Sequence, residues 1–566
     1  IQDITENHKW APEKLGRVVT KEESVAYSLM AGCDLDCGSI YPTYAENAVN
    51  TGVLSEDVID QALLRLFTAR MQTGEFDPAE DVPYRSETYS FDNQVENAEH
   101  KQLAEDSAND TIVLLKNEAA NGESDPILPL DISAGKNIVM VGGIADEVVL
   151  GGYSGTPSEE NTSTPIQGME ALGADVTYIE GAATAPAGSY ICNMRNVIIH
   201  KKDGTTVTLK PSDAKELVGC RYEAGSGNIG YITPGATLMY ENVDVKNIDS
   251  ISFEVAGDTS VLPGTITVTM DSLSGMQFAS VKTESTGGWQ TYKELSYTVT
   301  DAGGYSTQDL YFSFSMEYQN VTFTDEETQQ IQNADTVIVC LEGNTSGEGT
   351  DRSTIVMPSG QISLINTLAQ LNPRTVVYLQ TVGAVELGDF MDNVPAILWT
   401  CYNGQAQGNA MARVICGEVN PTAKLPFTWY AQNAALPTID DYDIRGGEDY
   451  AGWTYQYYTG PVTYPFGYGL SYSSYEYSNL KITSSTTVTP NDTLTATVDV
   501  KNTSDVDGEE IVQLYVAVPN PDGVNRPFKQ LKSFEKVAIP AGETKTVTLT
   551  LDLSDCYFWD EEEGRK

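Results

Sequence analysis

Helical and strand-like segments alternate over residues 96–184, stop, and resume over residues 323–478. This interrupted alternation constrains the fold more than any other feature, because strands separated by helices favour a mainly parallel sheet covered on both faces. We therefore predict one discontinuous α/β sandwich domain. Its predicted strands are 112–117, 137–141, 176–179, 336–340, 375–380 and 396–399, and its predicted helices include 97–109, 166–172, 359–371 and 405–416.

The interruption, residues 185–322, contains few helical patterns and many short alternating runs, such as 250–255 and 265–270. Alternation with a period of two is typical of strands that have one buried face. We expect a self-contained antiparallel β-sandwich inserted into a loop, which the domain tolerates because loop-closure entropy grows only logarithmically with loop length. Strand-like runs separated by turn signals predict a second sandwich at residues 479–566.

The N-terminal residues 1–73 are predicted to form a helix, a short strand at 33–38 and a second helix. Thr20 and Glu23 form a capping-box pattern at the start of the first helix. These elements are too few to close a domain, and they resemble the last βα units of a larger (β/α)8 barrel. The polar residues 74–95 predict a linker. We expect the barrel and the C-terminal sandwich to continue beyond this chain.

The charge of the chain excludes some classes of partner. Its 33 Lys and Arg residues stand against 80 Asp and Glu residues, which gives a formal net charge of −47. Such a surface repels phosphate backbones, so nucleic-acid binding is not expected. Membrane insertion is not expected either, because no segment is long and apolar enough to cross a bilayer. The 8 Cys form no CxxC pair and only 3 His are present, so the sequence predicts no zinc site.

The loop SGEGTDR, residues 346–352, carries Glu348 between two glycines. It comes soon after the apolar segment 336–340, so we expect it at the carboxyl end of a parallel strand, where ligands usually bind in open α/β sheets. The glutamate is either part of a solvated acidic turn or a mobile acid that is delivered to a substrate. Its place at a strand end favours the second interpretation.

Several separate stretches resemble glycoside hydrolase family 3, and within that family they are most similar to β-xylosidases. The resemblance implies a retaining exo-glycosidase built from a (β/α)8-like barrel, an α/β sandwich and a fibronectin-III-like domain, the last at residues 479–566. It also implies that no cofactor is needed. The matching stretches are AGCDLDCGSIYP (31–42), LLKN (114–117), LPL (128–130), GGYSG (151–155), SGEGTDR (346–352), YNGQAQGNAMARVICGEVNPTAKLPFTWY (402–430) and TYPFGYGLSY (463–472).

The general acid/base of the family corresponds to Glu348, and Asp351 with Arg352 matches a pair that we expect to hold the shape of the loop. The resemblance assigns the nucleophile to a barrel aspartate that precedes Ile1. Retaining hydrolysis needs both carboxyl groups, one on each side of the anomeric carbon. We therefore expect the 566-residue chain to be inactive by itself and the parent protein to be active.

Further substrate contacts are predicted near the barrel remnant. Asp34 and Cys37 lie at the end of its predicted strand, where barrel residues face the substrate. Trp10 follows the strand that would carry the nucleophile. The alternatives are that Cys37 is simply packed and that Trp10 belongs to a surface helix or loop.

The insert resembles a family 6 carbohydrate-binding module. Such modules grip a sugar ring between two aromatic side chains and an asparagine, and the matching residues are Tyr231, Trp289 and Asn320. Glu223 matches a position that often holds a calcium ligand, so a structural calcium ion is the one metal that the resemblance implies. The alternative is that Tyr231 and Trp289 belong to the core of the sandwich. The matching stretches are CRYEAGSGNIGYI (220–232), YENVDV (240–245) and TGGWQTY (286–292).

These features favour an exo-β-xylosidase that releases xylose from the non-reducing ends of xylo-oligosaccharides and thus takes part in xylan degradation. β-Glucosidase and α-L-arabinofuranosidase activities of the same family are alternatives, because most residues that select the sugar belong to the rest of the barrel. A non-catalytic carbohydrate-binding protein is an alternative of another class. The expected partner is an oligosaccharide or polysaccharide, which favours an extracellular or cell-surface location. The sequence makes no prediction of oligomeric state.

Overall fold

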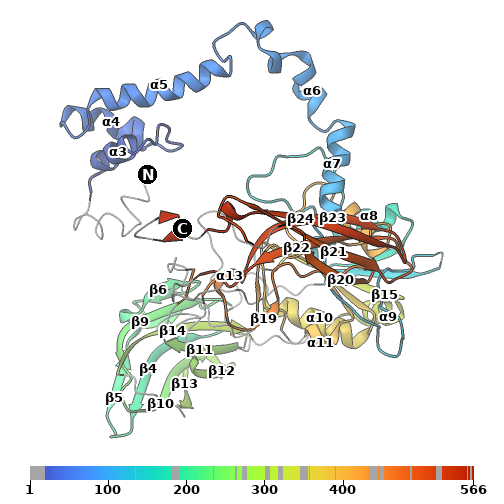
Figure 1. Ribbon diagram of the computed structural model, residues 1–566. Coiled ribbons are helices and arrows are strands. Elements are labelled where there is room, and N and C mark those ends of the chain that lie inside the picture. The colour runs from blue at the N-terminus through green and yellow to red at the C-terminus, as the bar shows by residue number, and fades with distance from the viewer. Residues whose placement is uncertain are drawn as a thin grey trace. The chain divides into compact units, whose positions relative to one another are not determined.

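The computed structural model divides the chain into two compact units, Ile1–His100 and Lys101–Lys566 (Figure 1). Each unit is described by itself. The described residues are 19–566 without 134, 182–189, 234, 260, 262–263, 271–276, 300–305, 317–320, 322, 344–354, 356, 389, 432–443, 447–451, 485–486, 518–525, 558, 561–563 and 566.

In the described part of the first unit, three helices between residues 21 and 72 surround a small apolar core. The predicted capping box is confirmed, because Glu23 N–H donates to Thr20 Oγ1 at 3.2 Å and Thr20 N–H donates to Glu23 Oε2 at 2.9 Å. The predicted strand at 33–38 is wrong: this segment is a loop without a strand partner among the described residues of the unit. The helices are α3 (Lys21–Met30), α4 (Ile40–Asn50) and α5 (Glu56–Gln72).

Short turns connect this core to the second unit. Single-turn 3-10 helices and one short α-helix occupy much of the predicted linker, residues 74–95. Tyr84, Tyr89 and Phe91 are exposed along this stretch. Its elements are η1 (Ala79–Asp81), η2 (Pro83–Arg85), η3 (Glu87–Tyr89) and α6 (Phe91–Gln94), followed by the longer helix α7 (Ala98–Asn109).

A six-stranded sheet forms the centre of the α/β part, in the order β1-β17-β16-β15-β2-β3. The last five strands pair in parallel, and β1 joins β17 antiparallel, so the predicted mainly parallel sheet is confirmed. Each strand agrees with its predicted range to within one residue at either end. The strands are β1 (Val113–Asn117), β2 (Asn137–Val141), β3 (Asp175–Ile179), β15 (Thr336–Leu341), β16 (Thr375–Gln380) and β17 (Ala396–Thr400).

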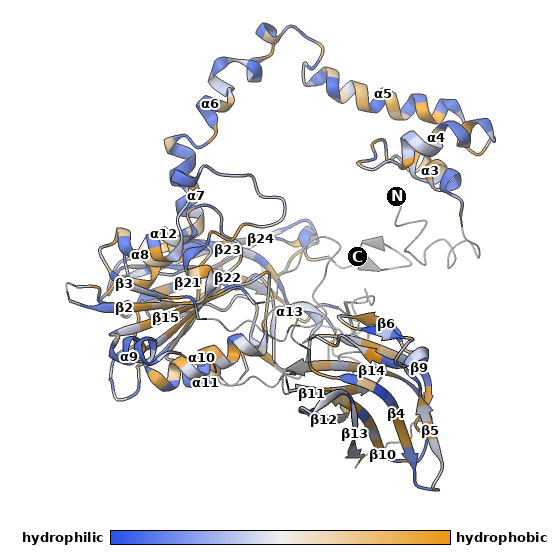
Figure 2. Cartoon of the chain, turned by 180° about the vertical axis from the view of Figure 1, so that it is seen from behind, coloured by the Kyte–Doolittle hydropathy of each residue, from blue (hydrophilic) through white to orange (hydrophobic). Residues whose placement is uncertain are grey.

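Helices cover both faces of this sheet because its strands are apolar on both sides. In β15, Val337 and Val339 enter one core, while Ile338 and Cys340 enter the other. Helices α9, α10 and α11 pack on the first core, and α8 and α12 pack on the second. Figure 2 shows the apolar strands between these layers. The helices are α8 (Pro165–Ala171), α9 (Asp325–Asn333), α10 (Ser359–Leu371), α11 (Phe390–Asn393) and α12 (Gln407–Ile415), with the 3-10 helices η4 (Gly143–Asp146) and η5 (Glu159–Asn161).

The region between β3 and α9 consists of two antiparallel sheets that enclose one apolar core. One sheet has the order β13-β10-β4-β8-β7, with β5 beside β4, and the other has the order β12-β11-β14-β9-β6. Phe253 and Phe312, from different sheets, meet in the core with ring centroids 6.3 Å apart. The elements are β4 (Asn193–Lys201), β5 (Thr206–Leu209), η6 (Pro211–Asp213), β6 (Lys215–Val218), β7 (Arg221–Glu223), β8 (Asn228–Gly230), β9 (Thr237–Asp244), β10 (Ile248–Gly257), β11 (Gly264–Met270), β12 (Gln277–Thr283), β13 (Gly288–Thr298) and β14 (Thr307–Met316).

The C-terminal part forms a small sandwich of a three-stranded sheet, β20-β21-β24, and a two-stranded sheet, β22-β23. A buried ion pair between Lys424 and Glu510 joins it to the α/β part. The remaining elements are β18 (Trp429–Tyr430), α13 (Thr454–Tyr457), β19 (Val462–Tyr464), β20 (Tyr475–Ile482), β21 (Thr493–Asn502), β22 (Gly508–Val516), β23 (Gln530–Ile539), β24 (Thr544–Asp552), η7 (Leu553–Asp555), β25 (Trp559–Asp560) and β26 (Gly564–Arg565).

Within the part of the chain that the structure describes, no helix has the length and apolarity needed to cross a membrane.

Candidate functional site

Five residues singled out by the sequence lie outside the described residues. They are Glu348, Asp351, Arg352, Trp10 and Asn320. The structure does describe both ends of the loop that carries Glu348, and it describes the edge of the sheet where that loop begins.

We call this edge the carboxyl edge, because the parallel strands end there. β15 ends at Leu341, and the Gly343 N–H donates to Gln361 Oε1 of α10 at 3.2 Å. On the return side of the loop, the Glu386 N–H donates to the Ile355 carbonyl oxygen at 2.7 Å, a few residues beyond β16. Both ends of the Glu348 loop are therefore hydrogen-bonded near the carboxyl edge.

The turn after β2 reaches the same edge and requires a glycine. Gly142 has a φ of 110°, and a Cβ at this position would lie 2.2 Å from the Cys340 carbonyl oxygen of β15. A side chain there would clash with the neighbouring strand. The glycine is thus explained by close packing of two backbones, without any ligand.

Buried amide side chains join the loops of the carboxyl edge to the sheet. Gln407, fully buried in α12, accepts from Gln380 Nε2 at 2.7 Å and from the Val149 N–H at 3.2 Å through Oε1. Its Nε2 donates to the Gly404 carbonyl oxygen at 3.1 Å. One side chain therefore connects the end of β16 with the two loops that contain Val149 and Gly404. No pattern in the sequence indicated this role.

An exposed aromatic residue stands on the loop held by Gln407. Tyr153, in the stretch GGYSG, is 91% exposed. A Cβ placed on Gly151 would lie 3.2 Å from the ring of Tyr402, so the two loops contact each other. Sequence reasoning used GGYSG only as a family signature and missed Tyr153. The available signal was an aromatic residue among glycines in a loop after a strand end.

The carboxyl edge holds acidic side chains in partly buried surroundings. Burial raises the pKa of Glu342, the residue after β15, and the nearby charge of Glu147 raises it further. Burial also raises the pKa of Tyr178, with a contribution from Glu180. A carboxyl group in such surroundings holds its proton at a higher pH than in water.

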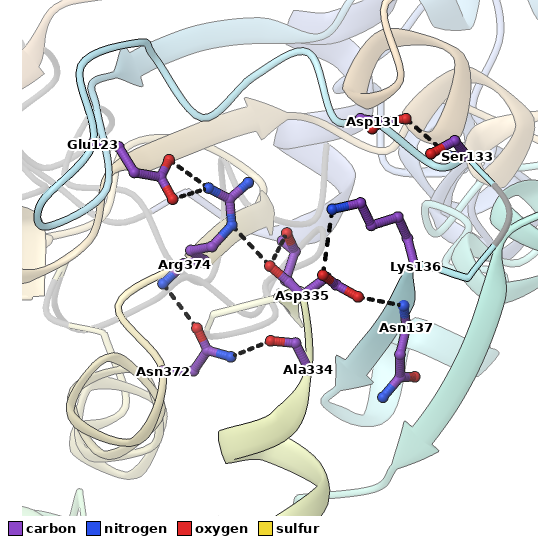
Figure 3. Close-up of polar contacts among 10 residues, drawn as sticks. Glu123, Asp131, Ser133, Lys136, Asn137, Ala334, Asp335, Asn372 and Arg374 are labelled. Carbon is purple, nitrogen blue, oxygen red and sulfur yellow. Dashed lines mark hydrogen bonds and ion pairs between the residues drawn. The ribbon is translucent and has the colours of Figure 1, made fainter.

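The opposite, amino-terminal edge of the sheet carries charges that pair with one another (Figure 3). Arg374 pairs with Glu123, and its Nε donates to the Asp335 carbonyl oxygen at 2.8 Å. Asp335 in turn receives Lys136 Nζ at 3.4 Å and the Asn137 N–H at 2.9 Å. These contacts link the starts of β2, β15 and β16, which is a structural role.

In the first unit, the two aspartates of AGCDLDCG have local partners. Asp34 accepts from Arg65 Nε at 2.8 Å and Nη2 at 2.7 Å, and this guanidinium lowers the pKa of the carboxyl group. Asp36 accepts three backbone N–H groups at the start of α4, which lowers its pKa. Cys37 is an exposed free thiol, not a packed residue. Contact of Asp34 and Cys37 with substrate stays a prediction.

The fold of the insert brings Tyr231 and Trp289 into one cluster. Tyr190 lies between them, with ring centroids 5.5 Å from Tyr231 and 6.1 Å from Trp289. Neither predicted residue belongs to the shared apolar core, and Tyr231 is 43% exposed. The Arg221 guanidinium lies 3.8 Å from the centroid of the Tyr231 ring. Sequence reasoning missed Tyr190 and Arg221, because only the fold brings them to the predicted residues. Arg221 arrives through the pairing of β7 with β8, and Tyr190 comes from the segment before β4.

Glu223 has a cationic partner within the protein. Its Oε1 accepts from Arg221 Nε at 3.0 Å. Among the described residues, no group of three or more His, Cys, Asp or Glu side chains is placed to hold a metal ion. Calcium takes six to eight oxygen ligands, several of them carboxylates. A calcium ion at Glu223 stays a prediction.

Comparison with known proteins agrees with this architecture. The glycosyl hydrolase family 3 C-terminal domain matches residues 112–472, and the fibronectin type III-like domain matches residues 510–566. A solved structure of a GH3 exo-β-xylosidase in complex with a xylobiose aziridine probe has a TM-score of 0.64 at 22% identity. It covers 100% of this chain, which spans 57% of that protein. A β-glucosidase structure from Listeria innocua has a TM-score of 0.60 at 20% identity, with coverages of 98% and 59%.

Two relatives align over nearly the whole chain. A xylan 1,4-β-xylosidase of Xylanibacter ruminicola is 28% identical over 99% of this chain, and a probable β-glucosidase J of Aspergillus fumigatus is 27% identical over 95%. The chain spans 65% and 68% of the lengths of these relatives. The match to the C-terminal domain of this family, residues 112–472, covers more than half of this chain, so the chain belongs to glycosyl hydrolase family 3.

Proposed function

We propose that this chain is the larger part of a retaining exo-glycosidase in which Glu348 is the general acid/base. The observation that supports the proposal is the place of SGEGTDR in the sequence: it lies within the family match and begins five residues after Leu341, where β15 ends at the carboxyl edge. Ligands of open α/β sheets usually bind at that edge. In the sequence, Glu348 stands between two glycines, the residues that restrict the backbone least.

Cleavage of the glycosidic bond by this mechanism needs a carboxyl group that is still protonated at neutral pH. At the start of the loop, partial burial raises the pKa of Glu342. Glu348 would donate its proton to the leaving oxygen and later accept one from water. The attacking carboxylate, about 5 Å away in retaining enzymes, is the barrel aspartate expected before Ile1. The 566-residue chain by itself is therefore expected to be inactive.

We propose xylo-oligosaccharides as the preferred substrates, with cleavage from the non-reducing end. The xylosidase-like stretch 31–42 and the similarity to a xylan 1,4-β-xylosidase support this choice. β-Glucosidase and α-L-arabinofuranosidase activities are the alternatives, and probable β-glucosidases are similar over almost as much of the chain. The measurement that separates them is kcat/KM of the full-length protein on matched aryl xylosides, glucosides and arabinofuranosides.

We further propose that the insert binds carbohydrate through Tyr231 and Trp289, with Asn320 as a third contact. The support is the cluster that Tyr190 completes outside the apolar core. Aromatic rings stack on the apolar CH faces of sugars, while the edges of the aromatic rings stay in water. The insert would hold polymeric substrate near the enzyme.

The acid role of Glu348 is tested by Glu348→Gln in the full-length protein. Loss of a general acid should slow substrates with poor leaving groups far more than activated aryl glycosides, by roughly 100-fold or more. The matched control is Glu342→Gln, which changes the carboxyl group that precedes the loop. Equal losses on both substrate types, or a leaving-group dependence in Glu342→Gln instead, would overturn the assignment.

A further inference from the structure

A cavity of about 370 Å3 lies where the C-terminal sandwich meets the α/β part. Strand β22 of the sandwich lines it with Gln513 and Tyr515, and the segment that contains Phe466 lines it from the α/β part. None of the described residues that line it belongs to the carboxyl edge or to the insert. Small-molecule sites usually have volumes of about 300–1,000 Å3 and often lie between domains. We call this space the junction cavity.

Aromatic rings form walls of the junction cavity, and neighbouring groups hold them in place. The ring of Phe466 stacks on Tyr455, with centroids 4.0 Å apart and planes at 16°. Tyr515 stands nearly perpendicular to Phe466, and its hydroxyl donates to Gln513 Oε1. Gln513 Nε2 donates in turn to the Gly467 carbonyl oxygen at 3.1 Å. These walls are ordered before a ligand arrives, which lowers the entropy cost of binding.

The one acidic side chain among the described lining residues, Glu510, is already paired within the protein. Its Oε2 lies 3.3 Å from Lys424 Nζ, and its Oε1 accepts from the Tyr477 hydroxyl at 2.8 Å. Lys424 Nζ also donates to the Gly469 carbonyl oxygen at 2.8 Å. An ammonium group has three N–H donors, so Lys424 keeps one for a ligand. The carboxylate of Glu510, in contrast, is neutralised and has each oxygen occupied.

A second lysine lines the cavity without an acidic partner. Lys529 is exposed, its Nζ lies 4.9 Å from the centroid of the Tyr515 ring, and no carboxylate among the described residues pairs with it. Two lysines and one glutamate leave an excess of one positive charge in the described lining. The chain as a whole is acidic, but physiological salt screens charges beyond about 8 Å. The local excess therefore favours a ligand with a negative charge.

We propose that the junction cavity binds a sugar that carries a carboxylate, such as a uronic acid residue of an oligosaccharide. The carboxylate would accept from Lys529 Nζ, and the apolar CH face of the ring would lie against the aromatic walls. Hydroxyl groups of the sugar would accept from the remaining N–H of Lys424 and donate to the Tyr515 hydroxyl oxygen. The inference depends neither on catalysis by Glu348 nor on sugar binding by the insert.

The test uses the 566-residue chain in calorimetric titrations with xylotriose that carries one glucuronic acid substituent, and with plain xylotriose. The acidic sugar should bind more tightly than plain xylotriose. Lys529→Gln should weaken binding of the acidic sugar about fivefold, the effect of losing one exposed ion pair, and leave plain xylotriose unaffected. Lys529→Arg keeps the charge and should bind the acidic sugar as the unmodified chain does. The matched control is Lys545→Gln, which removes another exposed lysine of the same sandwich, on β24, and should change nothing.

Each remaining outcome contradicts the inference in its own way. Equal losses in Lys529→Gln and Lys545→Gln, or equal affinities for the two sugars, would show that the cavity does not recognise the carboxylate. Displacement of the acidic sugar by an equal concentration of acetate would make the cavity a site for any carboxylate and overturn the sugar assignment. If Trp289→Ala abolishes binding of the acidic sugar while Lys529→Gln does not weaken it, the sugar binds to the insert. In that case the inference fails while carbohydrate binding by the insert stands.

Discussion

The carboxylate of Asp335 accepts a hydrogen bond from the Asn137 N–H at 2.9 Å and ties the first residue of β2 to the residue before β15. Lys136 Nζ lies 3.4 Å from the same carboxylate, and Arg374 Nε donates to the Asp335 backbone carbonyl oxygen at 2.8 Å. A sheet whose strands come from distant parts of the sequence needs such contacts where its strands begin, because no short turn aligns them.

The stability of the α/β part should depend on the charge of Asp335. The Asn137 N–H, opposed by burial and aided by Lys136, lowers its pKa below the usual 3.8. The stabilisation is therefore present above that usual value and lost as the pH falls through the lower, folded-state pKa. Asp335→Asn should cost about 1 kcal/mol at neutral pH and weaken the acid dependence of stability. Urea unfolding at neutral and acidic pH measures both effects.

The control for that experiment is Asp131→Asn. Its carboxylate accepts from the Ser133 N–H within one loop and links no strands. An acid dependence of Asp335→Asn equal to that of the unmodified chain would contradict the prediction.

Gln407 should matter for stability and for the shape of the carboxyl edge. Gln407→Ala removes the acceptor of the Val149 N–H and the nearer acceptor of Gln380 Nε2, which keeps only Asn403 Oδ1 at 3.4 Å. We expect a loss of roughly 2–4 kcal/mol in the free energy of unfolding. Gln405→Ala, which removes one half-buried contact to the Asn161 carbonyl oxygen, should cost much less. Similar losses in both variants, measured by urea unfolding, would refute a special role of Gln407.

Tyr153 should affect substrate binding without affecting stability. The side chain is 91% exposed, so Tyr153→Ala should leave the melting temperature unchanged. We expect its ring to stack on the leaving-group sugar, a contact worth about 1 kcal/mol. In the full-length protein, Tyr153→Ala should then raise KM severalfold on xylotriose. The KM on a small aryl xyloside, which has no leaving-group sugar, should not change. Tyr153→Phe should behave like the unmodified protein. An equal KM change on both substrates would exclude the stacking role.

The ion pair between Lys424 and Glu510 should hold the C-terminal sandwich to the α/β part. Both side chains are mostly buried, and the Tyr477 hydroxyl donates to Glu510 Oε1 at 2.8 Å. Lys424→Met leaves a buried carboxylate without its cation, which typically costs about 3 kcal/mol or more. The double variant Lys424→Met with Glu510→Leu should recover much of that loss. A double-mutant cycle of unfolding free energies measures the coupling, and additive losses would contradict it.

The sequence was sufficient to predict the strands of the α/β part. The apolar, β-branched segment from Thr336 to Cys340 is recognisable as a buried strand, because a parallel strand must be apolar on both faces. The predicted strand at Cys33–Gly38 failed because a strand also needs a partner. In the structure, Asp36 instead satisfies the N-terminal N–H groups of α4, an arrangement that periodicity does not reveal.

By itself, the sequence determined the apolar runs, the turn positions and the place of Glu348 after a strand, because these depend on neighbouring residues. The tertiary structure decided which distant residues meet. Gln407 reaches Val149, and Tyr190 joins Tyr231 to Trp289, only because strand order and register bring them together. Sheet order follows from the packing of the whole domain, so the candidate sites required the fold in addition to the motifs.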